Sequence, residues 1–335
     1  MYRSKISGIG HYVPENVVTN KDLEAFMETS DEWIQERTGI KERRWIDPNS
    51  DDMPSTMGTK AARVAIENAG LTPDDIDFIV FATLSPDYYF PGPGVQVQEQ
   101  LGIKEVGALD VRNQCSGFIY SLSVADQFIK TGMYENILVI GSEYHSGGLE
   151  KSTRGRGVTV IFGDGAGAVV VSRSEDDSKG ILSTHLHSEG KHAKELALIG
   201  PATSRWVDTI MDEKDPNDLS YYPYMNGNFV FKHAVTRFEQ VINEALEENG
   251  FASSDIDMLI PHQANLRISQ FIQRKMGLSD DNVYNNIMRY GNTTAASIPI
   301  AMSEAWQEGK IQSGNMVCLA AFGSGFTWAS ALIKW

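Results

Sequence analysis

Two stretches of the sequence, 180 residues apart, share one pattern: LTPDDIDFIVFATLSPD at residues 71–87 and FASSDIDMLIPHQANLR at residues 251–267. Each places Asp-Ile-Asp before an apolar run, and each follows a helical pattern that ends in NAG or ENG. A second pair, ENILVIGSEYHSGG at 135–148 and GNMVCLAAFGSGF at 314–326, repeats at a similar offset. Self-similarity at a fixed offset indicates duplication. The sequence therefore predicts two copies of one α/β unit that meet near residue 175.

Strand-like and helix-like segments alternate within each copy. The apolar runs at 77–85 and 136–144 predict buried strands, and the patterns at 57–70 and 118–132 predict helices that end in glycine. This alternation is typical of a largely parallel sheet covered by helices. We expect an N-terminal half at 1–175 and a C-terminal half at 176–335. Within the second half, the region from about 190 to 225 breaks the pattern and predicts a long loop insertion.

Composition and charge exclude several classes of protein. A chain of 335 residues exceeds the usual size of one hydrophobic core, and 41% hydrophobic with 22% charged residues is typical of globular proteins. No run of about 18 apolar residues is present, the first residues lack the apolar core of a signal peptide, and two cysteines give no disulfide framework. We therefore expect a cytoplasmic protein without a membrane segment. The net charge of −15 argues against nucleic acid as a partner.

One cysteine lies in ALDVRNQCSGFIYSL, residues 108–122. Free cysteine is among the most buried residue types, so Cys115 could be a core thiol. However, a strand is predicted to end near Val111, and Ser116 and Gly117 begin a helical pattern. We expect the helix N-terminus to lower the pKa of the Cys115 thiol, as in activated nucleophiles. Cys318 lies in the apolar run MVCLAAF and is interpreted as a core residue.

Two further polar residues follow predicted strands or turns. His262 comes after an apolar strand and Pro261, in LIPHQANLR, and Asn292 lies in the polar turn RYGNTTAAS. Alone, each has a structural interpretation, as a strand-end histidine and as a turn or cap residue. Together with Cys115 they form a Cys, His and Asn set at strand ends, where α/β proteins gather catalytic groups.

The glycine-rich segment FGDGAGAVVV, residues 162–171, is not interpreted as a phosphate loop. A dinucleotide site needs a helix after the glycines, whereas an apolar run precedes and follows them here. We predict a tight hairpin of strand, turn and strand.

At this point the chain resembles the β-ketoacyl-acyl-carrier-protein synthase III family of the thiolase superfamily over essentially its whole length. The resemblance rests on six ordered segments: TSDEWIQERTGIKER (29–43), CSGF (115–118), RGVTVIFGDGAGAV (156–169), PHQANLRI (261–268), YGNTTAAS (290–297) and FGSGFTW (322–328). It implies a thiolase-like α/β fold, a duplicated five-layered αβαβα sandwich, and a homodimer. That fold agrees with the duplication read from the sequence itself.

The resemblance also implies an activity. Cys115, His262 and Asn292 match the family's catalytic triad. The implied reaction is a decarboxylating Claisen condensation of an acyl-CoA primer with malonyl-acyl carrier protein through an acyl-cysteine, which initiates fatty acid synthesis. The backbone N–H groups of Cys115 and Ser324 would stabilise the oxyanion. No metal or cofactor is implied, because the CoA thioester is a substrate.

Binding residues are implied at further positions. Trp33 and Arg156 match the pair that sandwiches the CoA adenine ring, and Arg37 matches a contact to the nucleotide. The positions that match the pantetheine tunnel are Phe162, Gly227, Phe231, Ala264 and Asn265. The positions implied for the acyl pocket are Leu84 and Phe90.

The chain also departs from the family pattern. Small residues usually precede the nucleophile, where this chain has Arg112-Asn113-Gln114. Ser324 stands where glycine is usual, and Leu84 stands where a smaller residue is common. The insertion at 190–225 is longer than usual. These departures leave the primer and the pathway open.

The implied carrier protein is acidic, so an enzyme with net charge −15 needs a local basic patch. We hypothesise that Lys232, Arg237 and Arg267 form this docking patch, because they lie beside positions that match the family's binding residues.

Three alternative functions remain at this stage. A Cys-His-Asn peptidase has the same residue order, but the flank of Cys115 lacks the papain-type pattern. A thiolase-superfamily synthase that condenses longer acyl groups or makes a secondary metabolite would share the catalytic residues. A non-enzymatic acyl-CoA binder would form no covalent adduct.

Overall fold

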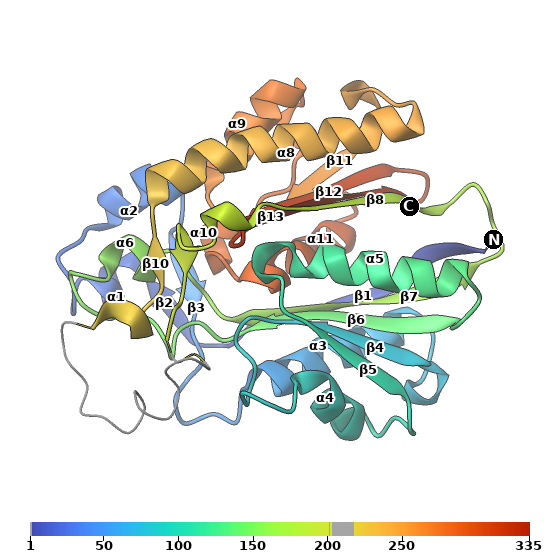
Figure 1. Ribbon diagram of the computed structural model, residues 1–335, viewed down its shortest axis with the longest axis horizontal. Helices are drawn as coiled ribbons and strands as arrows, with labels where there is room; N and C mark the ends of the chain where they lie inside the picture. The colour runs from blue at the N-terminus through green and yellow to red at the C-terminus, as the bar shows by residue number, and fades with distance from the viewer. Residues whose placement is uncertain (1, 201, 203–217) are drawn as a thin grey trace.

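The computed structural model describes residues 2–200, 202 and 218–335, and Figure 1 shows them as five stacked layers. The helices of these layers are α3 (Pro54–Asn68), α4 (Pro93–Leu101), α5 (Gly117–Lys130), α8 (Gly227–Asn249), α9 (Leu266–Met276) and α11 (Ser297–Gln307). From top to bottom in Figure 1 lie α8 with α9, a four-stranded sheet, α5 with α11, a five-stranded sheet, and α3 with α4. The predicted αβαβα sandwich is confirmed.

The five-stranded sheet is built from the first half of the chain. Its strands are β1 (Arg3–Tyr12), β4 (Phe78–Ala82), β5 (Gly107–Val111), β6 (Asn136–Glu143) and β7 (Gly165–Ser174). Their order is β1-β7-β6-β4-β5, with β6, β4 and β5 parallel and with β7 antiparallel to both neighbours. The parallel strands β4 and β6 are almost entirely buried between helices, which explains their continuous apolar sequences.

The four-stranded sheet repeats this arrangement with the second half of the chain. Its strands are β8 (Gly180–Ser188), β11 (Met258–Pro261), β12 (Met316–Gly323) and β13 (Thr327–Lys334). Their order is β11-β12-β13-β8, with β11 and β12 parallel and β13 antiparallel to both of its neighbours. Thus β11 and β12 take the places that β4 and β6 hold in the first sheet. The predicted duplication is confirmed by this topology, while the domain boundary near residue 175 stays a prediction.

The repeated Asp-Ile-Asp has the same structural role in both copies. Asp77 accepts hydrogen bonds from the backbone of the strand β6, which neighbours β4, at Asn136 N (2.8 Å). Asp257, at the equivalent position, accepts from Met316 N at the start of β12 (2.6 Å). Each aspartate therefore joins the starts of two parallel strands, and this pairing explains why the motif occurs twice.

The predicted hairpin at residues 162–171 is wrong. The short helix α6 (Arg156–Thr159) comes before this segment. Gly163 precedes β7, and Gly165 and Gly167 lie within this single strand. Asp164 precedes β7 and is fully buried, where it accepts hydrogen bonds from three backbone N–H groups, those of Ile46, His145 and Ser146. Gly167 allows the close approach of α11, because a Cβ there would lie 2.7 Å from the Pro299 Cβ. The local pattern of glycines therefore reflects helix packing instead of a turn.

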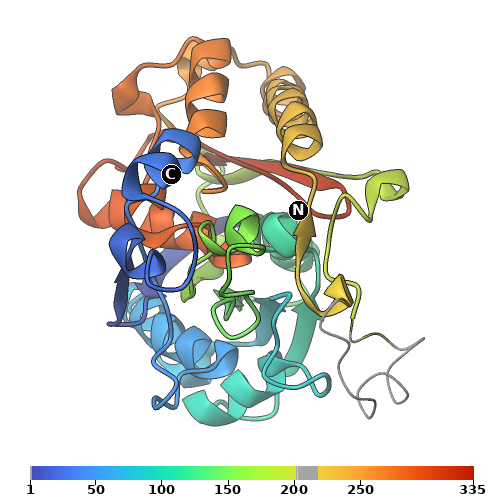
Figure 2. The same cartoon turned by 90° about the vertical axis from the view of Figure 1, so that its left-hand side faces the viewer.

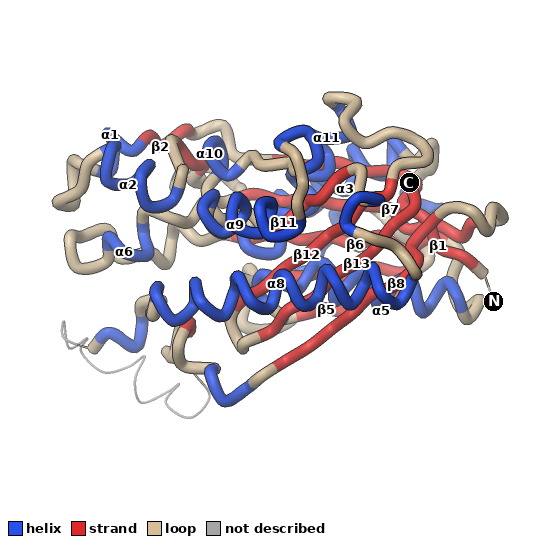
Figure 3. The backbone as a smooth tube through the Cα atoms, turned by 90° about the horizontal axis from the view of Figure 1, so that it is seen from above, coloured by secondary structure: helices blue, strands red, loops and turns tan. Residues whose placement is uncertain are grey.

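Small elements gather at one end of the sandwich, on the left of Figure 1. They are β2 (Val17–Thr19), α1 (Asn20–Leu23), α2 (Asp31–Thr38), β3 (Glu42–Arg44), β9 (Leu196–Ala197), β10 (Tyr224–Met225) and α10 (Ile287–Tyr290). Figure 2 looks at this end, with the blue N-terminal helices beside the orange segment that contains α9. In Figure 3 the long helix α8 lies across the strands from this end.

The region predicted as a loop insertion, residues 190–225, is only partly described. Its described ends form a short two-stranded ribbon, β9 paired antiparallel with β10, and residues 201 and 203–217 lie outside the described residues. Among the described helices, none is long and apolar enough to cross a membrane.

Candidate active site

Cys115 lies where the sequence places it, between β5 and α5, in the 3₁₀ turn η2 (Gln114–Ser116). Gln114 takes a left-handed backbone with φ of 44°, which is uncommon for a residue other than glycine and turns the chain sharply before the nucleophile. The backbone N–H groups of Cys115 and Ser324 both donate toward the Cys115 sulfur. The two predicted oxyanion donors therefore converge on one point.

The thiol itself differs from the sequence prediction. Cys115 is buried, and burial, aided by the negative charge of nearby Glu143, raises its pKa to about 12. The two backbone donors lower that pKa, but they do not outweigh the cost of removing a thiolate from water. The prediction of a lowered thiol pKa is wrong for the substrate-free cavity, where the thiol keeps its proton at neutral pH.

The residues that precede the nucleophile have separate environments. Arg112 is exposed to solvent, Gln114 supplies the sharp turn, and the Asn113 side chain hydrogen bonds to the Tyr120 hydroxyl on α5. That hydroxyl donates in turn to His187 O (2.9 Å). Asn113 thus links the turn that contains Cys115 to the first turns of α5.

His262 follows β11 and is a neutral hydrogen-bond donor. The Ser297 hydroxyl lies 2.6 Å from His262 Nδ1 and accepts from the backbone N–H of Gln263 (3.3 Å). When this hydroxyl donates to Nδ1, the ring proton lies on Nε2, which has no hydrogen-bond partner among the described residues. Burial lowers the pKa of His262 to about 3, so the ring stays uncharged.

Asn292 presents a second donor. Its backbone N–H donates to Ile161 O (2.8 Å), and its side-chain Oδ1 accepts from Thr294 N (2.8 Å) in the 3₁₀ turn η7 (Thr294–Ala296). With the oxygen held in this way, the Nδ2 amine is left to donate. The turn geometry, which the sequence interprets as a cap, here orients the side-chain amide of Asn292 for donation.

These three side chains meet in one cavity of about 560 Å³. The sequence-predicted residues that line it are Trp33, Arg37, Cys115, Phe162, Gly227, Phe231, His262, Ala264, Asn265 and Asn292. The segments come from both halves of the chain, and Asn265 Nδ2 donates to Arg37 O (2.9 Å) to join them. Only tertiary folding brings this set together.

Two guanidinium groups approach the Trp33 indole at the mouth of this cavity. The Arg37 carbon Cζ is 4.5 Å from the indole centroid, and that of Arg156 is 4.9 Å from it. The indole is half-buried, so a flat, electron-rich ring system can stack beside it. This arrangement suits a purine.

The two residues predicted for the acyl pocket lie outside the cavity that contains Cys115. Neither Leu84 nor Phe90 lines the cavity, and the Phe90 ring is 72% exposed on a loop that also exposes Tyr88 and Tyr89. The backbone N–H of Leu84 instead donates to Glu143 (3.1 Å).

The predicted docking residues divide into two groups. Lys232 and Arg267 are exposed and have no ion-pair partner among the described residues, and Arg267 also lines the cavity. Arg237 instead contacts Glu189 (2.9 Å) and lies 4.4 Å over the Trp328 ring. Its guanidinium therefore fastens α8 to the second sheet.

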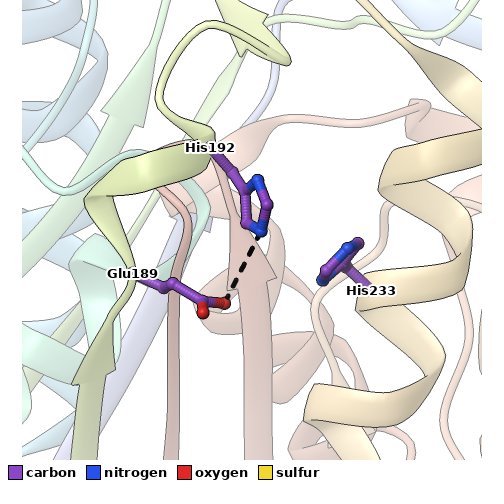
Figure 4. A group of neighbouring side chains, drawn as sticks. All are labelled: Glu189, His192 and His233. Carbon is purple, nitrogen blue, oxygen red and sulfur yellow. Dashed lines mark ion pairs between the residues drawn. The ribbon is translucent and has the colours of Figure 1, made fainter.

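A group of Glu189, His192 and His233 could in principle hold a metal ion. Figure 4 shows the two imidazoles and the carboxylate facing one another, with ligand atoms within 4.8 Å. However, Lys191 and Arg237 each contact a different oxygen of the Glu189 carboxylate. A divalent ion here would lie beside two positive charges, so we interpret the group as an ionic clamp.

Two residues of this region were missed by the sequence analysis. Ser297 Oγ lies 2.6 Å from His262 Nδ1 and orients the ring. Glu143 is fully buried and accepts hydrogen bonds from the residues Thr83, Leu84 and Ser85. An ionisable residue at the end of the apolar run 136–144 is the one signal that could have identified Glu143. Ser297 gives no such signal, because serine is common at helix starts.

Comparisons with known proteins were consistent over the whole chain. Residues 109–190 match the family described as 3-oxoacyl-[acyl-carrier-protein (ACP)] synthase III, and residues 246–335 match its C-terminal part. β-Ketoacyl-[acyl-carrier-protein] synthase III of Salmonella arizonae is 47% identical over 331 residues, which cover 99% of each chain.

Solved structures agree with these sequence matches. A crystal structure of 3-oxoacyl-[acyl-carrier-protein] synthase III from Aquifex aeolicus VF5 has a TM-score of 0.90 and 43% identity, and the match covers 99% of this chain and 100% of that one. The priming β-ketosynthase from the R1128 polyketide biosynthetic pathway has a TM-score of 0.89 and 30% identity, with 99% and 96% covered.

Proposed function

Because this chain belongs to the 3-oxoacyl-[acyl-carrier-protein] synthase III family, we propose that it condenses an acyl-CoA primer with malonyl-acyl carrier protein and so initiates fatty acid synthesis. The observation that carries the proposal is a buried thiol faced by two neutral side-chain donors in one cavity. The peptidase alternative is set aside by this family membership, and a non-enzymatic binder would have no use for a pair of side-chain donors that face a thiol in one cavity.

The first half-reaction transfers the acyl group to Cys115. The sulfur attacks the thioester carbon, the carbonyl oxygen becomes an oxyanion, and the N–H groups of Cys115 and Ser324 donate to it. The bond to CoA sulfur then breaks, and the thiol proton ends on the released CoA. We do not assign His262 as the base here, because burial lowers its pKa to about 3 and so makes it a weak base.

The second half-reaction uses the side-chain donors. His262 Nε2 and Asn292 Nδ2 donate to the thioester oxygen of the malonyl group, which stabilises the enolate formed as CO₂ leaves. The enolate carbon attacks the acyl carbon on Cys115, and the cysteine thiolate is expelled toward its two backbone donors. A neutral His262 suits this role, since it donates without changing its charge.

The cavity mouth supports CoA as the first substrate. Trp33, Arg37 and Arg156 would hold the adenine and nucleotide end, and the apolar walls at Phe162 and Phe231 would hold the pantetheine arm. The proposed reaction needs no further cofactor. It does need a reduced Cys115, which supports our proposal that the enzyme works in the cytoplasm.

We also propose that the enzyme is a homodimer. β5 is an edge strand of the first sheet, and its Leu109 is exposed. The loop that follows β4 exposes three aromatic residues, Tyr88, Tyr89 and Phe90. Unpaired edges and exposed aromatic groups are usually covered by a partner. In such a dimer, Phe90 would contribute to an acyl pocket of the second copy, since it does not line the cavity of its own.

Intact-protein mass spectrometry after incubation with a panel of acyl-CoAs tests the function. We expect an acyl adduct on the wild-type protein whose mass names the primer, and no adduct on Cys115→Ala. A secondary-metabolite synthase would prefer long or unusual primers in the same panel. Equal labelling of Cys115→Ala would overturn the assignment of the nucleophile.

A further inference from the structure

The hydroxyl of Ser324 points away from the turn that contains its backbone donor and contacts a wall of the cavity. Ser324 lies in the turn between β12 and β13, and its Oγ donates to Leu196 O in β9. Leu196 pairs with Met225 of β10, and both side chains line the cavity that contains Cys115. The ribbon β9–β10 is thus fastened to the residue that supplies an oxyanion donor.

A chain of hydrogen bonds continues from this contact to the nucleophile turn. Thr327 Oγ1 donates to Ser324 O (3.2 Å) and lies 3.2 Å from Ser116 Oγ, and the Ser116 hydroxyl donates to Thr327 O (3.1 Å). Ser116 directly follows Cys115. Both oxyanion donors therefore belong to one network whose outer end is the ribbon.

The other side of the turn is fixed firmly. Glu189 and Phe326 exchange two backbone hydrogen bonds (2.8 and 3.1 Å), and Arg237 holds the Glu189 carboxylate from α8. The Phe326 end of the turn is thus anchored, and Ser324 connects the opposite end of the turn to the cavity wall. A displacement of the wall therefore acts on the Ser324 end of the turn.

We propose that Ser324 is a positioning and specificity-determining residue: its hydroxyl couples the oxyanion N–H to the β9–β10 wall, so acyl transfer responds to the width of the group beside Leu196 and Met225. A straight primer leaves the wall and the donor in place. A branched primer pushes the wall outward and draws the donor away from the oxyanion. This inference rests on the proposed acyl transfer to Cys115.

Single-turnover acylation of the full-length protein tests the proposal, with acetyl-CoA and isobutyryl-CoA as straight and branched probes. For Ser324→Ala we expect the acetyl transfer rate constant to fall about three- to tenfold, the loss typical of one neutral hydrogen bond, with KM within about twofold. The ratio of isobutyryl to acetyl transfer rises, because the wall moves freely. Ser324→Thr, which keeps the hydroxyl, restores both values.

Ser330→Ala is the matched control, because Ser330 lies on β13 and its buried hydroxyl also donates to a backbone oxygen, Val241 O (2.8 Å), away from the cavity. A Ser324→Ala protein with wild-type rates and ratio overturns the inference, as does an equal change in Ser330→Ala or a Thr variant that behaves like Ala. A wild-type protein that forms no adduct overturns the proposed function instead.

Discussion

Cys115 and Glu143 show how burial sets the chemistry of single residues. The carboxylate of Glu143 is fully buried at the end of β6. Burial raises its pKa from 4.5 to about 7, although four groups donate hydrogen bonds that lower this pKa. Its negative charge in turn contributes to the raised pKa of the Cys115 thiol. The carboxylate therefore makes ionisation of the thiol less favourable.

Replacing Glu143 by Gln should lower the pKa of the Cys115 thiol, because it removes the nearby negative charge. The measurement is the rate of alkylation by iodoacetamide against pH, in a Cys318→Ala background so that only Cys115 reacts. We expect the midpoint to move to lower pH in Glu143→Gln. An unchanged or higher midpoint would contradict the role of this charge.

The same substitution has a stability consequence with a definite sign. Between pH 4.5 and about 7 the folded protein keeps a proton on Glu143 that the unfolded chain has released, so the free energy of unfolding falls as pH rises through this window. Glu143→Gln should lose that part of the pH dependence. Thermal unfolding at pH 5 and pH 7.5 measures the difference.

At the scale of elements, the site depends on how closely α11 packs on the first sheet. Ser297 is the first residue of α11 and contacts His262, and this helix lies against β7 where Gly167 has no Cβ. Gly141 on β6 allows the same close approach of Ala295 in η7, directly before α11. The position of His262 thus depends on a helix whose depth is set by glycines in the other half of the chain.

Gly167→Ala should push α11 outward and destabilise the fold. The added Cβ would lie 2.7 Å from the Pro299 Cβ and 2.8 Å from Ile300 N, contacts that only a backbone shift can relieve. We expect a loss of about 1–3 kcal/mol in the free energy of unfolding, measured by denaturant titration. Gly190→Ala, where a Cβ meets nothing within 4 Å, is the control, and equal stability of the two variants would refute the packing argument.

At the scale of the whole molecule, a net charge of −15 must coexist with an acidic partner. Long-range repulsion would slow association with an acidic carrier protein, so docking needs a local group of positive charges. Lys232 on α8 and Arg267 on α9 are exposed cations without ion-pair partners among the described residues, on elements that border the cavity. Arg237 is not available in the same way, because it contacts Glu189.

Reversing both docking charges, Lys232→Glu with Arg267→Glu, should weaken the carrier-protein step. We expect KM for malonyl-acyl carrier protein to rise about tenfold or more at low salt, and less at high salt, while acyl transfer from CoA changes far less. Arg274→Glu with Lys275→Glu, the same charge change at the far end of α9, is the control. An equal loss in both half-reactions would refute docking at this patch.

The sequence by itself determined the duplication and the family and singled out Cys115, His262 and Asn292 as the proposed catalytic residues, because these depend on local patterns and ordered motifs. The twin Asp-Ile-Asp segments predicted two equivalent sheets, and Cys115, His262 and Asn292 follow strands or turns that form as predicted. Trp33 was assigned through the family resemblance alone.

Only the tertiary structure decided the state and surroundings of these residues. Four features depend on groups that lie far away in the sequence: the thiol pKa, the contact of His262 with Ser297, the absence of the predicted hairpin at residues 162–171, and the hydrogen bond from Ser324 to Leu196. Burial and hydrogen bonding act across space, and a local pattern contains no information on which distant segment will supply the neighbouring charge, donor or wall.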